Sequence, residues 1–219
     1  MEHRKLNPVR VLLTAFEPYD HWTTNSSWLA VVELLKDFPS GGSLVTRRYP
    51  VDLPALQEKL KQDLQRDFDV VLHLGQAPGA SSIKLEAIAL NAAGCLDERG
   101  VELNEIIPGG PVAYRSNLPL GRWATLLRAN HIPSVISYHA GTFLCNAIMY
   151  LSHHEIQLRA SKVHKPVCLV GFVHLPLATE QVAAHGQSLP SLPVSTLVRS
   201  LRLLLEDLQD FNEQSEHVA

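Results

Sequence analysis

The sequence predicts an α/β protein, a three-layer sandwich in which helices cover both faces of a mostly parallel central sheet. Two observations support this prediction. Short runs of β-branched and aliphatic residues alternate along the chain with longer amphipathic segments, as they do in strand–helix–strand units. The apolar runs are nearly continuous and end in glycine or another small residue, which is typical of strands buried on both faces.

Four apolar runs are predicted to form strands of this sheet. Each run is short, rich in valine, leucine or isoleucine, and bounded by residues that favour turns. The predicted strands are residues 9–15 (VRVLLTA), 69–75 (DVVLHLG), 134–140 (SVISYHA) and 166–174 (PVCLVGFVH).

The segments between these runs carry apolar residues at helical spacing. The first follows Asn25, whose side chain can cap the free N–H groups of a helix start. The second places leucines at positions 53, 56, 60 and 64, on one face of a helix. We therefore predict helices at residues 26–38, 53–68, 120–130 and 194–208, and a further helix that begins around Cys145.

Composition and length indicate an ordinary globular protein. The chain has 219 residues, which fit a single domain over residues 1–219; 46% are apolar, 19% are charged, and the net charge is −3. This balance offers no basic face for nucleic acid. No segment resembles a signal peptide or a membrane span, so we expect a cytoplasmic protein with no membrane partner. The three cysteines, an odd and low number, are expected to be thiols.

A binding site is expected where the predicted strands end, because ligands of such sheets bind outside the carboxyl ends of the strands. The four strand ends continue as TAFEPYD, GQAPGA, HAGTFLCN and VHLPLA. A site assembled from these ends would contain Phe16, Glu17, Tyr19, Gln76, Cys145 and His174.

Cys145 is the candidate nucleophile. It follows a Gly-Thr turn and lies where a helix is expected to start, and a helix N-terminus favours the thiolate form of a cysteine. Position alone leaves open the alternative that Cys145 packs beneath the helix start. Cys168 lies in an apolar run and is interpreted as inert core, and Cys95 lies in a loop-like segment and is interpreted as incidental.

A cysteine nucleophile needs a base and a group that orients the base. His174 ends an apolar strand at the predicted site, whereas His153 and His154 are expected to face solvent on the helix. The orienting acid is either Glu86, in the apolar segment SSIKLEAIALN, or Glu17, and spacing does not decide between them. No metal site is predicted, because adjacent histidines point in different directions from a helix.

Five motifs, in order along nearly the whole chain, resemble those of the pyroglutamyl peptidase type I family, also called pyrrolidone-carboxylate peptidases. The segment LLTAFEPYDHWTTNSSW resembles the family's TGFEPFGG…NPSW, and GQAPGASSIKLEAIALN resembles GQAGG…ERVAIN. In the other three motifs, IPGGPVAYRSNLP of this chain resembles the family's GGPAAY…LP, SYHAGTFLCNAIMY resembles AGTFVCNHVFY, and GFVHLPLATEQVAAH resembles GFIHVPYLPEQ.

The resemblance implies a cofactor-free cysteine exopeptidase that removes an N-terminal pyroglutamyl residue from peptides through a thioester. Carried over by motif, the catalytic residues are Cys145, His174 and Glu86, so the resemblance favours Glu86 over Glu17. It also implies a substrate pocket lined by Phe16, Tyr19, Gln76, Phe143 and Leu144. Members of the family are often tetrameric, so a homo-oligomer is expected.

The chain departs from the family pattern at the pocket. Ala15 stands where the family has glycine, and Tyr19 and Asp20 stand in its FGG segment. The loop around Cys95 is shorter than the family's and places no arginine in register, although Arg99 could reach the site. These departures support an alternative, a divergent member that binds a lactam or a modified N-terminus with weak or no peptidase activity.

Overall fold

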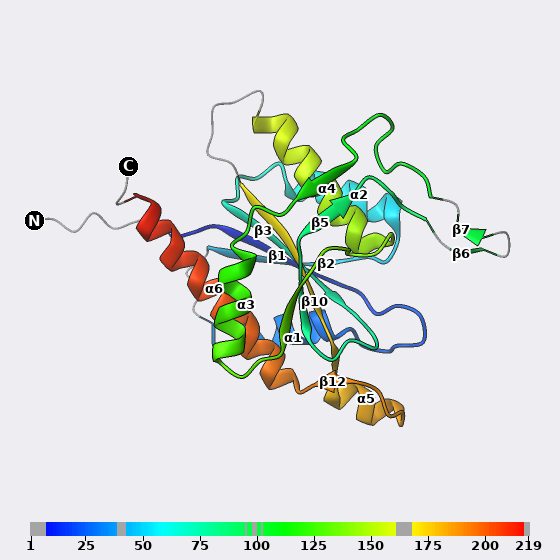
Figure 1. Cartoon of the computed structure of the whole chain (residues 1–219), viewed down its shortest axis with the longest axis vertical. Coiled ribbons are helices and arrows are strands. Elements are labelled where there is room, and N and C mark those ends of the chain that lie inside the picture. The colour runs from blue at the N-terminus through cyan, green and yellow to red at the C-terminus, as the bar shows by residue number, and fades with distance from the viewer. Residues whose placement is uncertain are drawn as a thin grey trace, which may run out of the picture.

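A six-stranded sheet forms the centre of the fold (Figure 1). The computed structural model describes residues 8–38, 43–94, 96–97, 100–101, 103–160 and 168–216. From one edge to the other, the strands are β2 (Leu44–Tyr49), β1 (Val11–Phe16), β3 (Val70–Gln76), β10 (Leu169–Leu175), β4 (Ile83–Glu86) and β9 (Ser134–Ser137). The four predicted strands are present, but β9 ends earlier than expected, and β2 and β4 were not predicted.

The sheet is mostly parallel, with one reversal. The strands β2, β1, β3 and β10 run in one direction, whereas β4 is antiparallel to β10 and β9 is parallel to β4. The reversal follows from chain length, because residues 77–82 between β3 and β4 are too few for a parallel crossover. The end of β9 therefore does not lie at the same edge as the other predicted strand ends, and that part of the sequence prediction was wrong.

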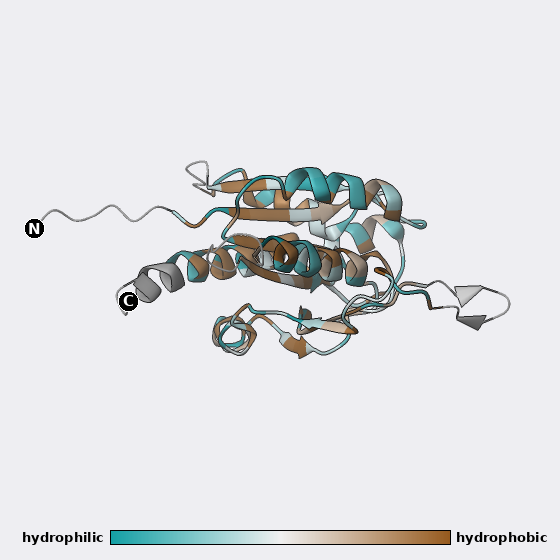
Figure 2. Cartoon of the chain, turned by 90° about the horizontal axis from the view of Figure 1, so that it is seen from above, coloured by the Kyte–Doolittle hydropathy of each residue, from teal (hydrophilic) through white to brown (hydrophobic). Residues whose placement is uncertain are grey.

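Helices cover both faces of the sheet, as predicted for the three-layer arrangement. The first face packs against α1 (Ser26–Leu34), α3 (Leu120–Ala129) and α6 (Val194–Glu216). The second face packs against α2 (Leu53–Asp63) and α4 (Leu144–Ala160). Most of the strand ribbon is coloured as hydrophobic in Figure 2, which agrees with strands covered on both faces.

Smaller elements lie outside the main sheet. A short helix, α5 (Thr179–His185), follows β11 (Leu177–Ala178), which pairs with β12 (Ser191–Leu192). Two antiparallel pairs also form. They are β5 (Ile88–Leu90) with β8 (Ala113–Arg115), and β6 (Leu96–Asp97) with β7 (Gly100–Val101). Within the described residues, no helix is long and apolar enough to cross a membrane.

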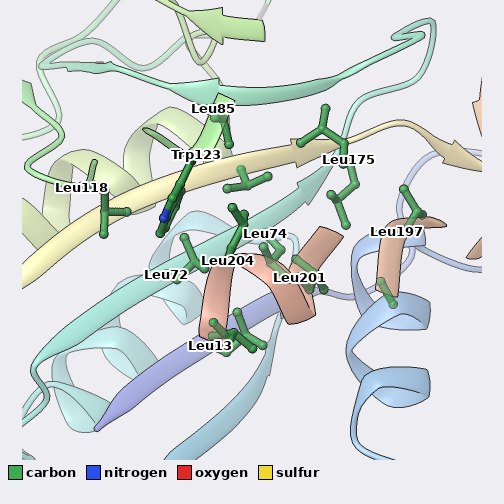
Figure 3. Close-up of a cluster of buried hydrophobic side chains, with 14 of the residues drawn as sticks. Leu13, Leu72, Leu74, Leu85, Leu118, Trp123, Leu175, Leu197, Leu201 and Leu204 are labelled. Carbon is green, nitrogen blue, oxygen red and sulfur yellow. The ribbon is translucent and has the colours of Figure 1, made fainter. Parts of the chain in front are cut away.

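Trp123 is the largest side chain in the core of the first face. Figure 3 shows it among leucines that come from the sheet and from α6. Its ring is fully buried, and its Nε1 donates a hydrogen bond to Asp207 on α6 at 2.9 Å. Asp207 also accepts a hydrogen bond from Arg122 at 2.6 Å. The indole thus fills the core while its polar atom stays satisfied, and the same contact joins α3 to α6.

The core of the second face contains a buried histidine. His73 of β3 forms a 2.7 Å hydrogen bond with Thr14 on β1 and a 2.8 Å hydrogen bond with Ser152 on α4. Burial lowers the pKa of His73 to about 3, with a smaller contribution from His153. His73 is therefore neutral at physiological pH and connects two strands to the helix that carries Cys145.

The prediction that His153 faces solvent was wrong. His153 is 6% exposed and its ring stacks on Tyr114, with 5.6 Å between the ring centroids. His154 is half-buried and its Nδ1 lies 2.9 Å from the Tyr114 hydroxyl. No local pattern indicates this burial, because β5 and β8, which cover the helix face, come from a distant part of the chain.

Candidate active site

A pocket opens between the end of β1, the end of β3 and the start of α4. Its lining contains Cys145 and all five residues predicted to contact a substrate: Phe16, Tyr19, Gln76, Phe143 and Leu144. Asn25 and Val51 complete the lining and were not predicted. Most of the lining is aromatic or aliphatic, so the pocket suits a small apolar group with few polar atoms.

His174 and Glu86 form a hydrogen-bonded pair inside the sheet. His174 Nδ1 lies 2.8 Å from Glu86 Oε1, and the glutamate side chain is 1% exposed. Glu86 lies opposite Phe172 in the antiparallel ladder, so it reaches His174 diagonally on the same face. Glu17 instead lies 3.9 Å from Arg48 with both side chains half-exposed. The structure therefore places Glu86, and not Glu17, beside the histidine.

Cys145 also forms a side-chain hydrogen bond with His174. Burial by itself lowers the pKa of His174, but the negative charge of Cys145 and a hydrogen bond to it act in the opposite direction. The hydrogen bond and charge of Glu86 add to this, and together they raise the pKa of His174 to about 9. His174 therefore holds a proton at neutral pH.

The chain reaches Cys145 through a turn that follows β9. The backbone N–H of Gly141 donates to His139 Nδ1 at 2.9 Å, and Gly141 has a φ of +84°, a conformation that favours glycine. The helix α4 then begins at Leu144, which places Cys145 in its first turn. The turn, rather than the direction of β9, brings the thiol to the site.

Asn146, the residue after Cys145, was not predicted to have a structural role. Its side chain is fully buried and accepts a hydrogen bond from the Leu90 backbone N–H at 2.8 Å. Its Nδ2 donates to the carbonyl oxygens of Leu90 at 2.9 Å and Ala92 at 2.8 Å. Asn146 thus fixes the start of α4 against the segment that follows Glu86. A polar residue within an apolar helix start is the sequence signal that could have identified it.

The loop after β1 carries the departures from the family pattern. Asp20 has a φ of 54°, in the left-handed region that glycine adopts freely and that aspartate tolerates better than most residues. The Asp20 carboxylate lies 2.7 Å from His21 Nδ1, and the buried Trp22 anchors the loop. The Tyr19 hydroxyl donates to the backbone carbonyl of Gln76 at 3.4 Å. Burial, followed by the charge of Cys145, raises the pKa of Tyr19 to about 12.

The other cysteines are separate from this site or outside the described residues. Cys168 is a free thiol immediately before β10, and burial raises its pKa to about 12. It therefore stays protonated and unreactive at neutral pH. Cys95 and Arg99 lie outside the residues that the structure describes. Across the described ranges, no group of three or more histidine, cysteine, aspartate or glutamate side chains could hold a metal ion.

Known proteins resemble this chain in sequence. The family model described as pyroglutamyl peptidase matches residues 9–210. The pyrrolidone-carboxylate peptidase of Clavibacter michiganensis is 36% identical over 87% of this chain and 88% of its own length. The Bacillus subtilis enzyme of the same name is 32% identical over 93% of this chain and 94% of its own.

Solved structures give the same result. The pyrrolidone carboxyl peptidase of Fervidobacterium islandicum matches with a TM-score of 0.80 and 35% identity, over 92% of this chain and 99% of that chain. A mutant pyrrolidone carboxyl peptidase from Pyrococcus furiosus matches with a TM-score of 0.77 and 32% identity, over 90% of this chain and 96% of that chain. The chain therefore belongs to the pyroglutamyl peptidase family and is a cysteine peptidase of the pyroglutamyl-peptidase I type.

Proposed function

We propose that the chain removes an N-terminal pyroglutamyl residue from peptides, with Cys145 as the nucleophile, His174 as the acid and base, and Glu86 as the residue that orients His174. The contact of His174 with both Cys145 and Glu86, beside an apolar pocket, is the observation that carries the proposal. Acyl transfer by a cysteine requires a nucleophile, a base in contact with it and a group that orients the base. Cys145, His174 and Glu86 provide these three groups in that order.

The reaction proceeds in two halves. The Cys145 thiolate attacks the carbonyl carbon that follows the lactam ring, and the protonated His174 gives its proton to the leaving amine as the C–N bond breaks. The product of this half is a thioester. His174, now neutral, takes a proton from water as the water oxygen attacks the thioester. The C–S bond then breaks, which releases pyroglutamate and restores the Cys145 thiolate and the protonated His174.

The start of α4 is placed to stabilise the negative charge that develops on the substrate carbonyl oxygen during the reaction. The first backbone N–H groups of a helix have no acceptor within the helix, and they point outward from its N-terminus. Since Cys145 lies in the first turn, an oxyanion formed on its substrate lies near these N–H groups. The same helix end favours the thiolate before the reaction begins.

Hydrolysis of pyroglutamyl-aminomethylcoumarin tests the proposal. The wild-type protein is expected to release the fluorophore, and Cys145→Ala is expected to release none above background. Cys145 should also react with iodoacetamide at neutral pH much faster than Cys168 does, which provides an internal comparison. If folded wild-type protein binds a lactam but releases no fluorophore, the alternative of a binding protein without peptidase activity replaces this proposal.

Cellular location and assembly are part of the same proposal. Cys145 and Cys168 are both free thiols, and a reducing compartment such as the cytoplasm keeps a nucleophilic thiol active. A homo-oligomer, as a tetramer, is expected from the family resemblance. Light scattering of the purified chain measures the assembly directly.

A further inference from the structure

The pocket contains one unusual pair of polar groups, the hydroxyl of Tyr19 and the backbone carbonyl of Gln76. The two oxygens are 3.4 Å apart, at the long limit for an O–H···O hydrogen bond. Such a bond is weak and is easily exchanged for a better one. Phe16, Phe143 and Leu144, which line the same pocket, offer no side-chain polar atom.

The other polar side chains near the pocket form hydrogen bonds within the protein, except that the buried Gln76 Nε2 has no partner within the described residues. Asn25 donates from Nδ2 to the Glu17 carbonyl at 3.1 Å, and its Oδ1 accepts from the backbone and side chain of Ser27. The Gln76 side-chain oxygen accepts from the Ser26 backbone at 2.8 Å and from Gln181 at 2.9 Å. These bonds hold Gln76 in place, so its backbone carbonyl is a fixed acceptor beside a donor that can rotate.

The Tyr19 hydroxyl, a donor, and the Gln76 carbonyl, an acceptor, lie side by side and so match the adjacent C=O and N–H of a lactam. The ring forces the amide into the cis form, so its N–H and C=O lie next to each other on one edge. We propose that Tyr19 recognises the lactam carbonyl: on binding, its hydroxyl leaves Gln76 and donates to the lactam C=O, while the Gln76 carbonyl accepts the lactam N–H. This inference rests on the proposed function, and it assigns a hydrogen-bonding role to a hydroxyl that the family's phenylalanine lacks.

The environment of Tyr19 suits this role. With a pKa of about 12, the phenol keeps its proton over the range in which the enzyme works, so it remains a donor. Binding exchanges one long hydrogen bond for two to the ligand. An N-terminal proline has a ring of the same size but a charged nitrogen and no ring carbonyl, so it would leave Tyr19 without its new acceptor and is rejected.

Ligand-observed NMR titration of two small ring compounds tests the proposal without any need for turnover. The compound 2-pyrrolidone carries both the C=O and the N–H, whereas cyclopentanone carries only the C=O. In Tyr19→Phe, both are expected to bind roughly threefold to tenfold more weakly than to the wild type, which is the range for loss of one neutral hydrogen bond. The KM for pyroglutamyl-aminomethylcoumarin should rise by a similar factor with kcat nearly unchanged.

The two compounds separate this role from others. If Tyr19 only positions the Gln76 carbonyl, the substitution weakens 2-pyrrolidone and leaves cyclopentanone unchanged. If the hydroxyl competes with the ligand, Tyr19→Phe binds 2-pyrrolidone more tightly. Either result overturns the proposal, as does a wild-type protein that binds neither compound.

A matched control comes from another tyrosine. Tyr114→Phe removes a hydroxyl that contacts His154, away from the pocket, and should leave both affinities unchanged. Thermal unfolding of each variant checks that the fold is retained. If 2-pyrrolidone binding depends on Tyr19 but no fluorophore is released from the coumarin substrate, the role of Tyr19 stands and the proposed peptidase activity fails.

Discussion

The sulfur of Cys145 lies against the backbone of Gly75. A β-carbon placed on Gly75 would stand 3.1 Å from that sulfur and 2.6 Å from Cζ of Phe172. Gly75 is near the end of β3, and the strand pairing places His174 beside it on β10. Because Gly75 has no side chain, the Cys145 sulfur can approach the sheet closely enough to reach His174.

Gly75→Ala is therefore expected to damage activity more than stability. The added methyl group displaces the thiol or the Phe172 ring, and misplacement of a nucleophile by about 1 Å costs on the order of 100-fold in rate. Overpacking of this kind lowers the free energy of unfolding by about 1–3 kcal/mol. Steady-state kinetics and urea unfolding of the same preparation measure the two effects.

Gly171 on β10 provides the control for this substitution. A β-carbon there would meet Leu118 and Ser116, in contacts that do not involve Cys145, His174 or Glu86. Gly171→Ala should lower stability while kcat, measured well below the unfolding temperature, stays near the wild-type value. An equal loss of kcat in the two alanine variants would show that the contact with Cys145 has no special importance.

The alkaline limit of activity should follow the proton of His174. Because its folded pKa of about 9 lies above the ordinary value of 6.5, the protonated form persists through neutral pH and is lost as pH rises through about 9. We expect kcat/KM to fall above this pH, since the leaving amine no longer receives a proton. The charge of His174 also stabilises the fold, and that contribution is present below about pH 6.5 and is lost as pH rises through about 9.

Glu86→Gln should move this limit to lower pH. The substitution removes the carboxylate charge that helps to raise the pKa of His174, and it also weakens the orientation of the ring. The maximal rate is expected to drop by about 100-fold or more, as for the loss of one acid–base partner. A pH–rate profile that keeps its alkaline limit in Glu86→Gln would contradict the role assigned to Glu86.

The buried histidines predict a loss of stability in acid. His73 and His153 have pKa values lowered by burial to about 3 and about 4, below the ordinary value of 6.5. The unfolded chain therefore binds protons that the folded chain does not. The contribution of these two histidines to the free energy of unfolding is fully present above about pH 6.5 and is lost as pH falls toward their folded pKa values. Each histidine contributes about 1.4 kcal/mol per pH unit in this window.

His153→Phe tests this origin of the pH dependence. The imidazole Nε2 of His153 is buried and has no hydrogen-bond partner within the described residues, while the ring stacks on Tyr114. Phenylalanine keeps the ring and removes the titrating group, so the slope of unfolding free energy between pH 5 and pH 6 should fall by about 1.4 kcal/mol per pH unit. Urea unfolding at closely spaced pH values gives the slope, and an unchanged slope would assign the acid sensitivity elsewhere.

Asn146→Ala should show whether Asn146 acts on the position of the α4 start, which carries Cys145, or on the proton of His174. The alanine variant loses all three hydrogen bonds to the segment after Glu86 and leaves buried backbone groups unpaired, at a cost of about 1–3 kcal/mol. We expect reduced kcat, with an unchanged alkaline limit because His174 and Glu86 are not altered. A shift of that limit would show that Asn146 acts on His174 and not only on the helix start.

Local patterns predicted the strands around Val11, Val70 and Leu169, and they placed Cys145 and His174 at ends of elements. They did not predict β2, which lies at an edge and carries two arginines among its six residues. They also could not decide between Glu86 and Glu17, because that choice depends on which strand lies beside β10. Strand order is a long-range property, and the reversal at β4 had no local signal beyond a short connection.

The place of β10 has a consequence for synthesis of the protein. The strands β3 and β4 are close in sequence, yet β10, from the last quarter of the chain, lies between them. Neighbouring strands are about 4.8 Å apart, so β3 and β4 cannot hydrogen-bond to each other across the place of β10, and the sheet is complete only once residues 169–175 are available. The strand β10 pairs with both β3 and β4, and it carries the His174 that contacts Glu86. A chain that ends before β10 therefore lacks the histidine of the proposed catalytic site, which is complete only once more than three quarters of the sequence has been made.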